Sequence, residues 1–106
     1  HIVTGHVDAV GRITSIAAEG DSRRFTFAVP AEIAPYIAPK GSVCLNGVSL
    51  TVNEVSDNQN GTIFTVNIIP HTASWTTFGD AQAGDDVNIE IDVLARYLQR
   101  MRQVMA

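Results

Sequence analysis

Apolar residues alternate with small or polar residues over several short stretches of the chain, which is the period-two pattern of half-buried β-strands. The pattern is clearest in the stretches RFTFAV and TIFTVNII. We predict strands around Val3, Val7 and Val10 and over Arg24–Val29, Ser42–Leu45, Val48–Val55, Thr62–Ile69 and Asp86–Ile91. Six short strands, separated by turns rich in Gly, Asn and Asp, are typical of an all-β barrel or sandwich.

Helical patterns are scarcer than strand patterns. Ala31–Ile37 and Pro70–Thr76 predict short connecting helices, the second because proline is favoured in a first helical turn. A longer helix follows Asp92, a residue type that caps helices, since apolar residues then recur at steps of three and four. They are Val93, Leu94, Tyr97, Leu98, Met101, Val104 and Met105. This stripe packs either against the end of the barrel or against another subunit.

Composition narrows the class of protein. The 106 residues are 45% hydrophobic and 17% charged, which predicts one folded domain. A formal charge of -4 argues against a nucleic-acid partner, because such proteins normally present a basic face. The apolar runs are far shorter than the ~20 residues of a membrane span. Cys44, the single cysteine, excludes an internal disulfide and is expected to be a packed core thiol, so we expect a cytoplasmic protein.

Polar residues interrupt the apolar strands at four places. In the segment Gly5–Val7, a glycine next to an imidazole lets a flat ligand approach the backbone, although a β-bulge is the plainer interpretation. Alternation places Ser49 and Thr51 on one face of their strand, with Val48, Leu50 and Val52 on the other. Paired hydroxyls can bind the polar edge of a heterocycle, but threonine is also common in strands for packing alone.

The other two places follow strands. The turn Ile69–Thr72 can offer backbone amides and the Thr72 hydroxyl to a ring edge, or it can be an ordinary helix start. Glu90 and Asp92 share a face, and Asp92 either caps the tail helix or binds the hydroxyls of a polyol. Lys40 is a fifth candidate, although exposed lysines commonly have no function. The three histidines, His1, His6 and His71, are too scattered to indicate a metal site.

In this order and spacing, four stretches resemble the second lumazine-binding repeat of the riboflavin synthase family: HIVTGHVDAVG, KGSVCLNGVSLTVNEV, NIIPHTASWTTFG and AGDDVNIEID. They cover nearly the whole chain from His1 to Asp92. The resemblance implies a six-stranded antiparallel Greek-key barrel over residues 1–92 and a C-terminal helix for oligomerisation over residues 93–106. Since the chain starts at His1 without a methionine, we expect it to be cut from a longer protein.

Members of this family dismutate two molecules of 6,7-dimethyl-8-ribityllumazine, which exchange a four-carbon unit to give riboflavin and 5-amino-6-ribitylamino-pyrimidinedione. The resemblance implies no cofactor and no metal. It implies a homotrimer in which the N-terminal barrel of a neighbouring subunit completes the site. Because much of the rate then comes from holding two rings in register, we expect the isolated chain to be inactive or weakly active.

The resemblance also implies site residues. His6, Ser49 and Asp92 are the expected catalytic residues, with His6 the best-placed proton carrier. Ser49 stands where the first repeat of the family has a cysteine, and His71 departs from the acidic residue of some relatives. The expected substrate contacts are Gly5, His6, Val7, Lys40, Ser49, Leu50, Thr51, Ile69, Pro70, His71, Thr72, Ala73, Ser74 and Asp92.

Two other functions compete with a synthase domain. A lumazine antenna protein holds the chromophore without turning it over. Such proteins tend to have lost polar ligand contacts in the second repeat, whereas this chain keeps His6, Ser49, Thr51, Thr72 and Asp92, which favours the synthase. A flavin-binding barrel of an oxidoreductase needs an RxxS/T-type flavin segment followed by a nucleotide domain, and these residues do not contain that combination.

Overall fold

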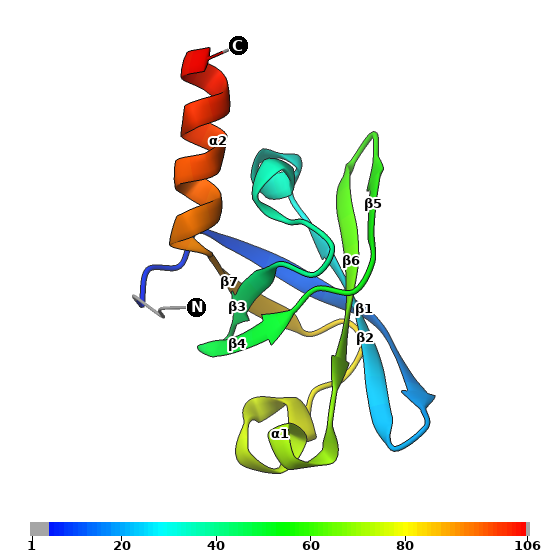
Figure 1. Ribbon diagram of the computed structural model, residues 1–106. Coiled ribbons are helices and arrows are strands. Elements are labelled where there is room, and N and C mark those ends of the chain that lie inside the picture. Colours follow the sequence, from blue (N-terminus) through cyan, green and yellow to red (C-terminus); the bar gives the residue numbers. More distant parts are fainter. Residues whose placement is uncertain (1–4, 106) are drawn as a thin grey trace.

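The computed structural model describes residues 5–105, with residues 74 and 75 described by their backbone alone. Within this part of the chain, seven antiparallel strands form one curled sheet in the order β4-β3-β7-β1-β2-β6-β5 (Figure 1). The strands are β1 (Ala9–Glu19), β2 (Ser22–Val29), β3 (Ser42–Leu45), β4 (Val48–Thr51), β5 (Val55–Asn58), β6 (Gly61–Ile68) and β7 (Asp86–Ile91). The predicted all-β fold is confirmed.

Short helices connect strands that are not neighbours in the sheet. The chain crosses from β2 to β3 through η1 (Ala31–Tyr36), and it returns from β6 to β7 through α1 (Pro70–Trp75) and η2 (Thr77–Gly79). Proline stands at the first position of α1, as its fixed φ and missing N–H favour. Both connecting helices lie where the sequence predicts them.

The two edges of the curled sheet are joined by consecutive residues. β4 pairs with β3, whereas β5 pairs with β6. Between them, Val52 bonds to the backbone of the residues just before β3 at 2.7 and 2.9 Å, and the next two residues bond to the backbone of Thr65 in β6 at 2.8 and 3.0 Å. The predicted strand Val48–Val55 therefore changes its partner midway. This change divides it into two strands and raises the count from six to seven.

Aromatic rings fill the inner face of the sheet. Phe25, Phe27, Phe64 and Phe78 are each 0% exposed. Phe27 stacks on Phe25 and Phe64 with ring centres 6.1 and 5.2 Å apart, and Phe78 meets Phe25 edge-on at 5.6 Å. Full burial of one such side chain contributes about 1.5–3 kcal/mol, so these four rings are a large part of the driving force for folding.

The first strand differs from the prediction. β1 begins at Ala9 and is 11 residues long, and it pairs with β7 through its first part and with β2 through most of its length. Val7 precedes the strand, and Val7 and Val10 are both exposed, so the valine spacing does not mark the buried face. That face is formed instead by Gly11 and Ile13, which are buried. Val3 and His1 lie outside the described residues.

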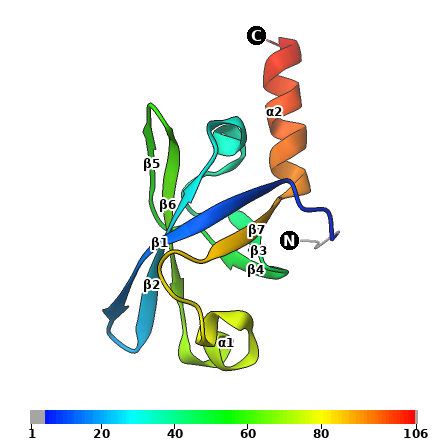
Figure 2. The ribbon, with the colours of Figure 1, turned by 180° about the vertical axis from the view of Figure 1, so that it is seen from behind.

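Helix α2 (Val93–Met105) points away from the curled sheet, at the opposite end of the molecule from α1 (Figures 1 and 2). The large apolar residues of its stripe from Leu94 to Met105 are 55–79% exposed. The expectation that the barrel end buries this stripe is wrong, because α2 touches the rest of the chain mainly at η1. Burial by another subunit stays a prediction.

No helix among residues 5–105 has the length and apolar character to span a membrane.

Two glycines hold tight backbone turns in different ways. In the β3–β4 turn, Asn46 and Gly47 both have positive φ (49° and 81°), which is the Asn-Gly hairpin turn that the sequence indicates. A Cβ on Gly47 would meet nothing within 4 Å. Gly61, at the start of β6, has φ 149°, and a Cβ there would lie 2.3 Å from the carbonyl oxygen of Val29. Of these two glycines, both have a positive φ, but only Gly61 also lacks room for a side chain.

We expect alanine at position 61 to destabilise the fold more than alanine at position 47. Gly47→Ala adds only the cost of a positive φ, about 1 kcal/mol of unfolding free energy. Gly61→Ala adds a backbone clash and is expected to cost about 3 kcal/mol or more. Urea unfolding of both variants measures the difference. Equal losses would contradict this account of the two turns.

Candidate functional site

The strand register aligns Ser49, Cys44 and Glu90 in one row across β4, β3 and β7. Cys44 pairs with Ser49 on one side and with Glu90 on the other, and directly paired residues of antiparallel strands point to the same face. The neighbours of Cys44 in β3, Val43 and Leu45, are buried in the core. The row therefore lies on the outside of the curled sheet. We call this surface, which comprises Ser42, Cys44, Ser49, Thr51 and Glu90, the outer face.

The β4 side chains follow the predicted alternation. Ser49 and Thr51 are exposed on the outer face, and Thr51 pairs with Ser42 of β3. Val48 and Leu50 pack against the core from the other side, and Val52 is buried in it. The side chain of Leu50 therefore lies on the opposite side of the sheet from Ser49. A ligand on the outer face can reach Leu50 only through its backbone.

Lys40 lies beside the end of β4. Its backbone N–H donates to the carbonyl of Val52 at 2.7 Å, which places its backbone next to the residue that follows Thr51. Lys40 is exposed and has a positive φ of 67°, a conformation that is uncommon for residues other than glycine. The structure thus brings three predicted site residues together at this strand: Ser49, Thr51 and Lys40.

The segment Gly5–Asp8 lies over the β7 side of the outer face. The backbone N–H of His6 donates to Glu90 Oε1 at 2.8 Å, and that of Asp8 donates to the carbonyl of Ile89 at 2.8 Å. The segment precedes β1 and belongs to no strand, so the β-bulge interpretation is wrong. It borders a hollow of about 160 Å³ lined by Gly5, Val7, Cys44, Asn46, Gly47, Asn88, Ile89 and Glu90.

Two buried polar groups line this hollow. Cys44 is 2% exposed and Glu90 is 6% exposed. Burial raises the pKa of the Cys44 thiol, and the charge of Glu90 raises it further, although a backbone hydrogen bond at Gly47 opposes both effects. The expected burial of Cys44 is confirmed, but its thiol belongs to the outer face. Its protonated form is the dominant one at neutral pH.

Glu90 is a site residue that the predicted set misses. Its carboxylate is buried beside a hollow, where such a group can accept a proton or a hydrogen bond from a ring N–H. The signal was present in the sequence, because alternation places Glu90 on one face with Asp92. What alternation does not show is the segment Gly5–Asp8 that covers Glu90, since this contact joins residues 84 positions apart.

Asp92 caps helix α2. Its Oδ1 accepts a hydrogen bond from the N–H of Leu94 at 3.1 Å, and its carbonyl accepts one from the N–H of Arg96 at 3.2 Å. The capping interpretation is therefore confirmed. A contact between Asp92 and a ligand stays a prediction.

The turn Ile69–Ser74 belongs to a different element from Asp92. It forms the start of α1, and α1 and α2 lie at opposite ends of the molecule in both views (Figures 1 and 2). Thr72 and Asp92 therefore lie in different elements, and a contact of both residues with one ribityl chain stays a prediction. The N–H of Ala73 donates to the carbonyl of Ile69 at 3.0 Å, as in an ordinary helix start. The side chain of Ser74 lies outside the described part.

A hollow of about 330 Å³ borders α1. Among its lining residues are Pro70 and Ala73 from the helix and Arg23 from β2. His71 is exposed on the same short helix, and Thr72 is half-buried, with its carbonyl accepting a hydrogen bond from the hydroxyl of Thr76 at 2.7 Å. The predicted site residues therefore fall into two groups, one on the outer face and one at α1.

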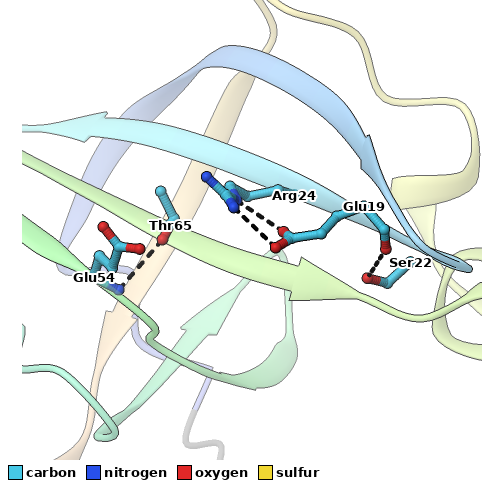
Figure 3. A network of polar contacts seen from close by, with 5 residues as sticks. All are labelled: Glu19, Ser22, Arg24, Glu54 and Thr65. Carbon is cyan, nitrogen blue, oxygen red and sulfur yellow. Dashed lines mark hydrogen bonds and ion pairs between the residues drawn. The ribbon is translucent and has the colours of Figure 1, made fainter.

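A second polar cluster lies across β1, β2 and β6 (Figure 3). Arg24 donates two hydrogen bonds to the Glu19 carboxylate at 2.8 and 2.9 Å. The bond from Arg24 holds the pKa of Glu19 below its ordinary value, and Glu19 in turn raises the pKa of Arg24. Both side chains are more than 40% exposed, so water screens the pair. The cluster ties the β1–β2 hairpin together and borders neither hollow described above.

Among residues 5–105, no three His, Cys, Asp or Glu side chains form a group that can hold a metal ion.

Comparison with known families identifies the class of this domain. A family model described as "Lumazine binding domain" matches residues 4–92, which is most of the chain. The chain belongs to the lumazine-binding domain family.

Individual relatives agree with this assignment. The chain is 52% identical over 103 residues to the riboflavin synthase of Brucella abortus (strain 2308), covering 97% of the chain and 49% of that protein. It is 46% identical over 101 residues to the riboflavin synthase of Photobacterium phosphoreum, covering 95% of the chain and 44% of that protein. The chain thus spans about half the length of these relatives.

Solved structures show the same fold. LumP complexed with 6,7-dimethyl-8-(1'-D-ribityl) lumazine matches with a TM-score of 0.75 and 27% identity, covering 87% of this chain and 49% of that chain. LumP complexed with riboflavin matches with a TM-score of 0.76 and 27% identity, covering 87% of this chain and 47% of that chain.

Replacing Glu90 with glutamine is expected to lower the pKa of Cys44. The substitution removes a negative charge near the thiol, while the amide oxygen can still accept the hydrogen bond from His6. The midpoint of the pH dependence of Cys44 alkylation by iodoacetamide should therefore move to lower pH. Asp86→Asn, at the other end of β7, is the control and should leave the midpoint unchanged. An unchanged midpoint in Glu90→Gln would refute the coupling of Glu90 to the thiol.

Proposed function

We propose that this chain is the second, C-terminal lumazine-binding domain of a riboflavin synthase. The observation that carries the proposal is the outer face, where β4 presents the exposed hydroxyls of Ser49 and Thr51 and Ser49 lies in register with the buried carboxylate of Glu90. The riboflavin synthase relatives at 52% and 46% identity support the enzyme class. Ser49 in the place of a cysteine supports the second repeat rather than the first.

The reaction of the whole protein would be the dismutation of two 6,7-dimethyl-8-ribityllumazine molecules to riboflavin and 5-amino-6-ribitylamino-pyrimidinedione. A four-carbon unit passes from one ring to the other, so two rings must be held face to face. Orientation of this kind can lower a barrier by roughly 7–11 kcal/mol. One barrel supplies one ring site, and the N-terminal barrel of a neighbouring subunit would supply the other. The isolated chain would therefore bind a ring but react poorly.

The outer face suggests a role for each predicted catalytic residue. Ser49, with Thr51 two positions on, presents hydroxyls that both donate and accept hydrogen bonds, which suits the carbonyls and ring nitrogens of a pyrimidine edge. His6, whose backbone is held by Glu90, is the proton carrier. Asp92, just before α2, would contact the ribityl hydroxyls.

A lumazine antenna protein is the second candidate. The likeness to LumP structures holding lumazine and riboflavin favours it, because the fold alone does not separate binding from turnover. The higher identity to riboflavin synthases and the retained polar residues on the outer face favour the enzyme. In either case we place the protein in the cytoplasm.

Removing the two exposed hydroxyls of β4 tests ligand binding. Ser49→Ala combined with Thr51→Ala is expected to weaken binding of 6,7-dimethyl-8-ribityllumazine about 10- to 100-fold, the loss of two hydrogen bonds. Fluorescence titration of the chain measures the affinity. The control, Ser15→Ala with Ser56→Ala, removes two exposed strand hydroxyls of β1 and β5 and should change little. Unchanged affinity in the Ser49→Ala, Thr51→Ala variant would contradict the proposed site.

Helix α2 is proposed as the oligomerisation element of the longer protein. Its exposed apolar stripe borders a hollow of about 460 Å³ lined by Leu98, Met101, Arg102 and Met105. An apolar surface of this kind is typical of a subunit interface.

Charges in the stripe are expected to break the assembly. Leu98→Glu with Met101→Glu in the two-barrel protein should lower its oligomeric order by light scattering, because each carboxylate would lose its hydration on burial. Arg100→Gln on the same helix is the control. A trimer that survives the two glutamates would rule out this stripe as the interface.

A further inference from the structure

Building on the proposed lumazine-binding role of the outer face, we propose that Asp8 and Arg96 are positioning residues of the ligand site. They form a clasp through which helix α2 holds the segment Gly5–Asp8 over β7. The segment contains the predicted ligand residues Gly5, His6 and Val7. The shape of the ligand site therefore depends on how the C-terminal helix is attached.

Asp8 ties the segment to two other elements at once. Its Oδ2 accepts a hydrogen bond from the backbone N–H of Ile91, the last residue of β7, at 2.7 Å. Its Oδ1 accepts a hydrogen bond from the guanidinium of Arg96 in the first half of α2. The Asp8 side chain is 20% exposed, so this ion pair is less screened than a fully exposed one. The two oxygens therefore fix the end of the segment against both the sheet and the helix.

Arg96 is itself held by a third element. Its guanidinium carbon lies 5.5 Å from the ring centre of Tyr36 in η1, a distance at which the ring face attracts a cation. η1 is also the element that α2 contacts most within the described chain. Since the apolar stripe of α2 is exposed, these contacts, together with the Asp92 cap, set the direction of the helix. Arg96 thus joins α2, η1 and the segment Gly5–Asp8.

The clasp acts on the ligand site through the segment. His6 meets Glu90 through its backbone N–H, and Gly5 and Val7 border the hollow over Cys44. Without the Arg96 contact, the segment keeps its bonds to β7 but loses its tie to α2, and we expect it to open more often. Coupling of this kind is reciprocal, so a partner that docks on α2 and moves Arg96 also changes the affinity of the outer face.

Cys44 reports the opening of the segment without any ligand. The thiol is 2% exposed and lines the same hollow as Gly5 and Val7, so we expect its reaction with 5,5′-dithiobis(2-nitrobenzoate) to be faster when the segment opens. Arg96→Ala is expected to speed this reaction about three- to tenfold, the range for loss of one partly screened ion pair. Arg96→Lys keeps the charge and should restore most of the protection. The control Arg24→Ala breaks the Arg24–Glu19 pair of the β1–β2 hairpin and should leave the rate unchanged.

A double-mutant cycle separates the clasp from a general loss of stability. Asp8→Asn keeps an oxygen for the Ile91 N–H but removes the charge that Arg96 meets. Asp8→Asn and Arg96→Ala should each speed the thiol reaction, and the double variant should be no faster than either one. The proposed clasp would be wrong if the effects of the two substitutions on the thiol reaction rate were additive. It would also be wrong if Cys44 reacted at the same rate in Arg96→Ala as in Arg24→Ala.

Titration with 6,7-dimethyl-8-ribityllumazine then tests the link to the ligand site. Arg96→Ala should weaken binding about three- to tenfold with an unchanged far-ultraviolet circular dichroism spectrum. Faster thiol reaction with unchanged affinity would overturn the positioning role. If the unaltered chain fails to bind, the proposed function is wrong, whereas the thiol rates still decide whether the clasp exists.

Discussion

The change of partner between Val52 and Glu54 is the constraint on which the rest of the structure depends. One strand bonds first to β3 and then to β6, and this joins the two edges of the curled sheet. The join places the inner residues of β4 and β6 against the same phenylalanine core. It also fixes which residues of β4 point outward, so Ser49 and Thr51 are presented on a rigid strand rather than on a loop.

Local patterns predicted much of this molecule. Alternation predicted most strands and the faces of β4, and the helix period predicted α2, because both depend on neighbouring residues alone. The division of residues 48–58 was missed, since it depends on Thr65 and on the residues before β3, which lie far away in the sequence. The valines near the start of the chain led to a wrong prediction of the buried face. Their spacing resembles that of a half-buried strand, but Val7 and Val10 are exposed.

The candidate site was predicted by residue type better than by location. Ser49, Thr51 and Gly5–Val7 do lie on or beside the outer face, but Ile69–Ser74 and Asp92 belong to different elements, at the start of α1 and just before α2. Glu90 and Asp8 were missed because their importance comes from contacts over more than 80 positions.

The central claim is that a lumazine ring binds on the outer face of β3, β4 and β7 and beside the α1 turn. Amide chemical shifts of the isotopically labelled chain, followed during titration with 6,7-dimethyl-8-ribityllumazine, test it most directly. We expect saturable shifts in residues 5–8, 49–51 and 69–74, with little change in the β1–β2 hairpin around Glu19 and Arg24. Shifts centred on that hairpin, or no saturable shifts at all, would contradict the account.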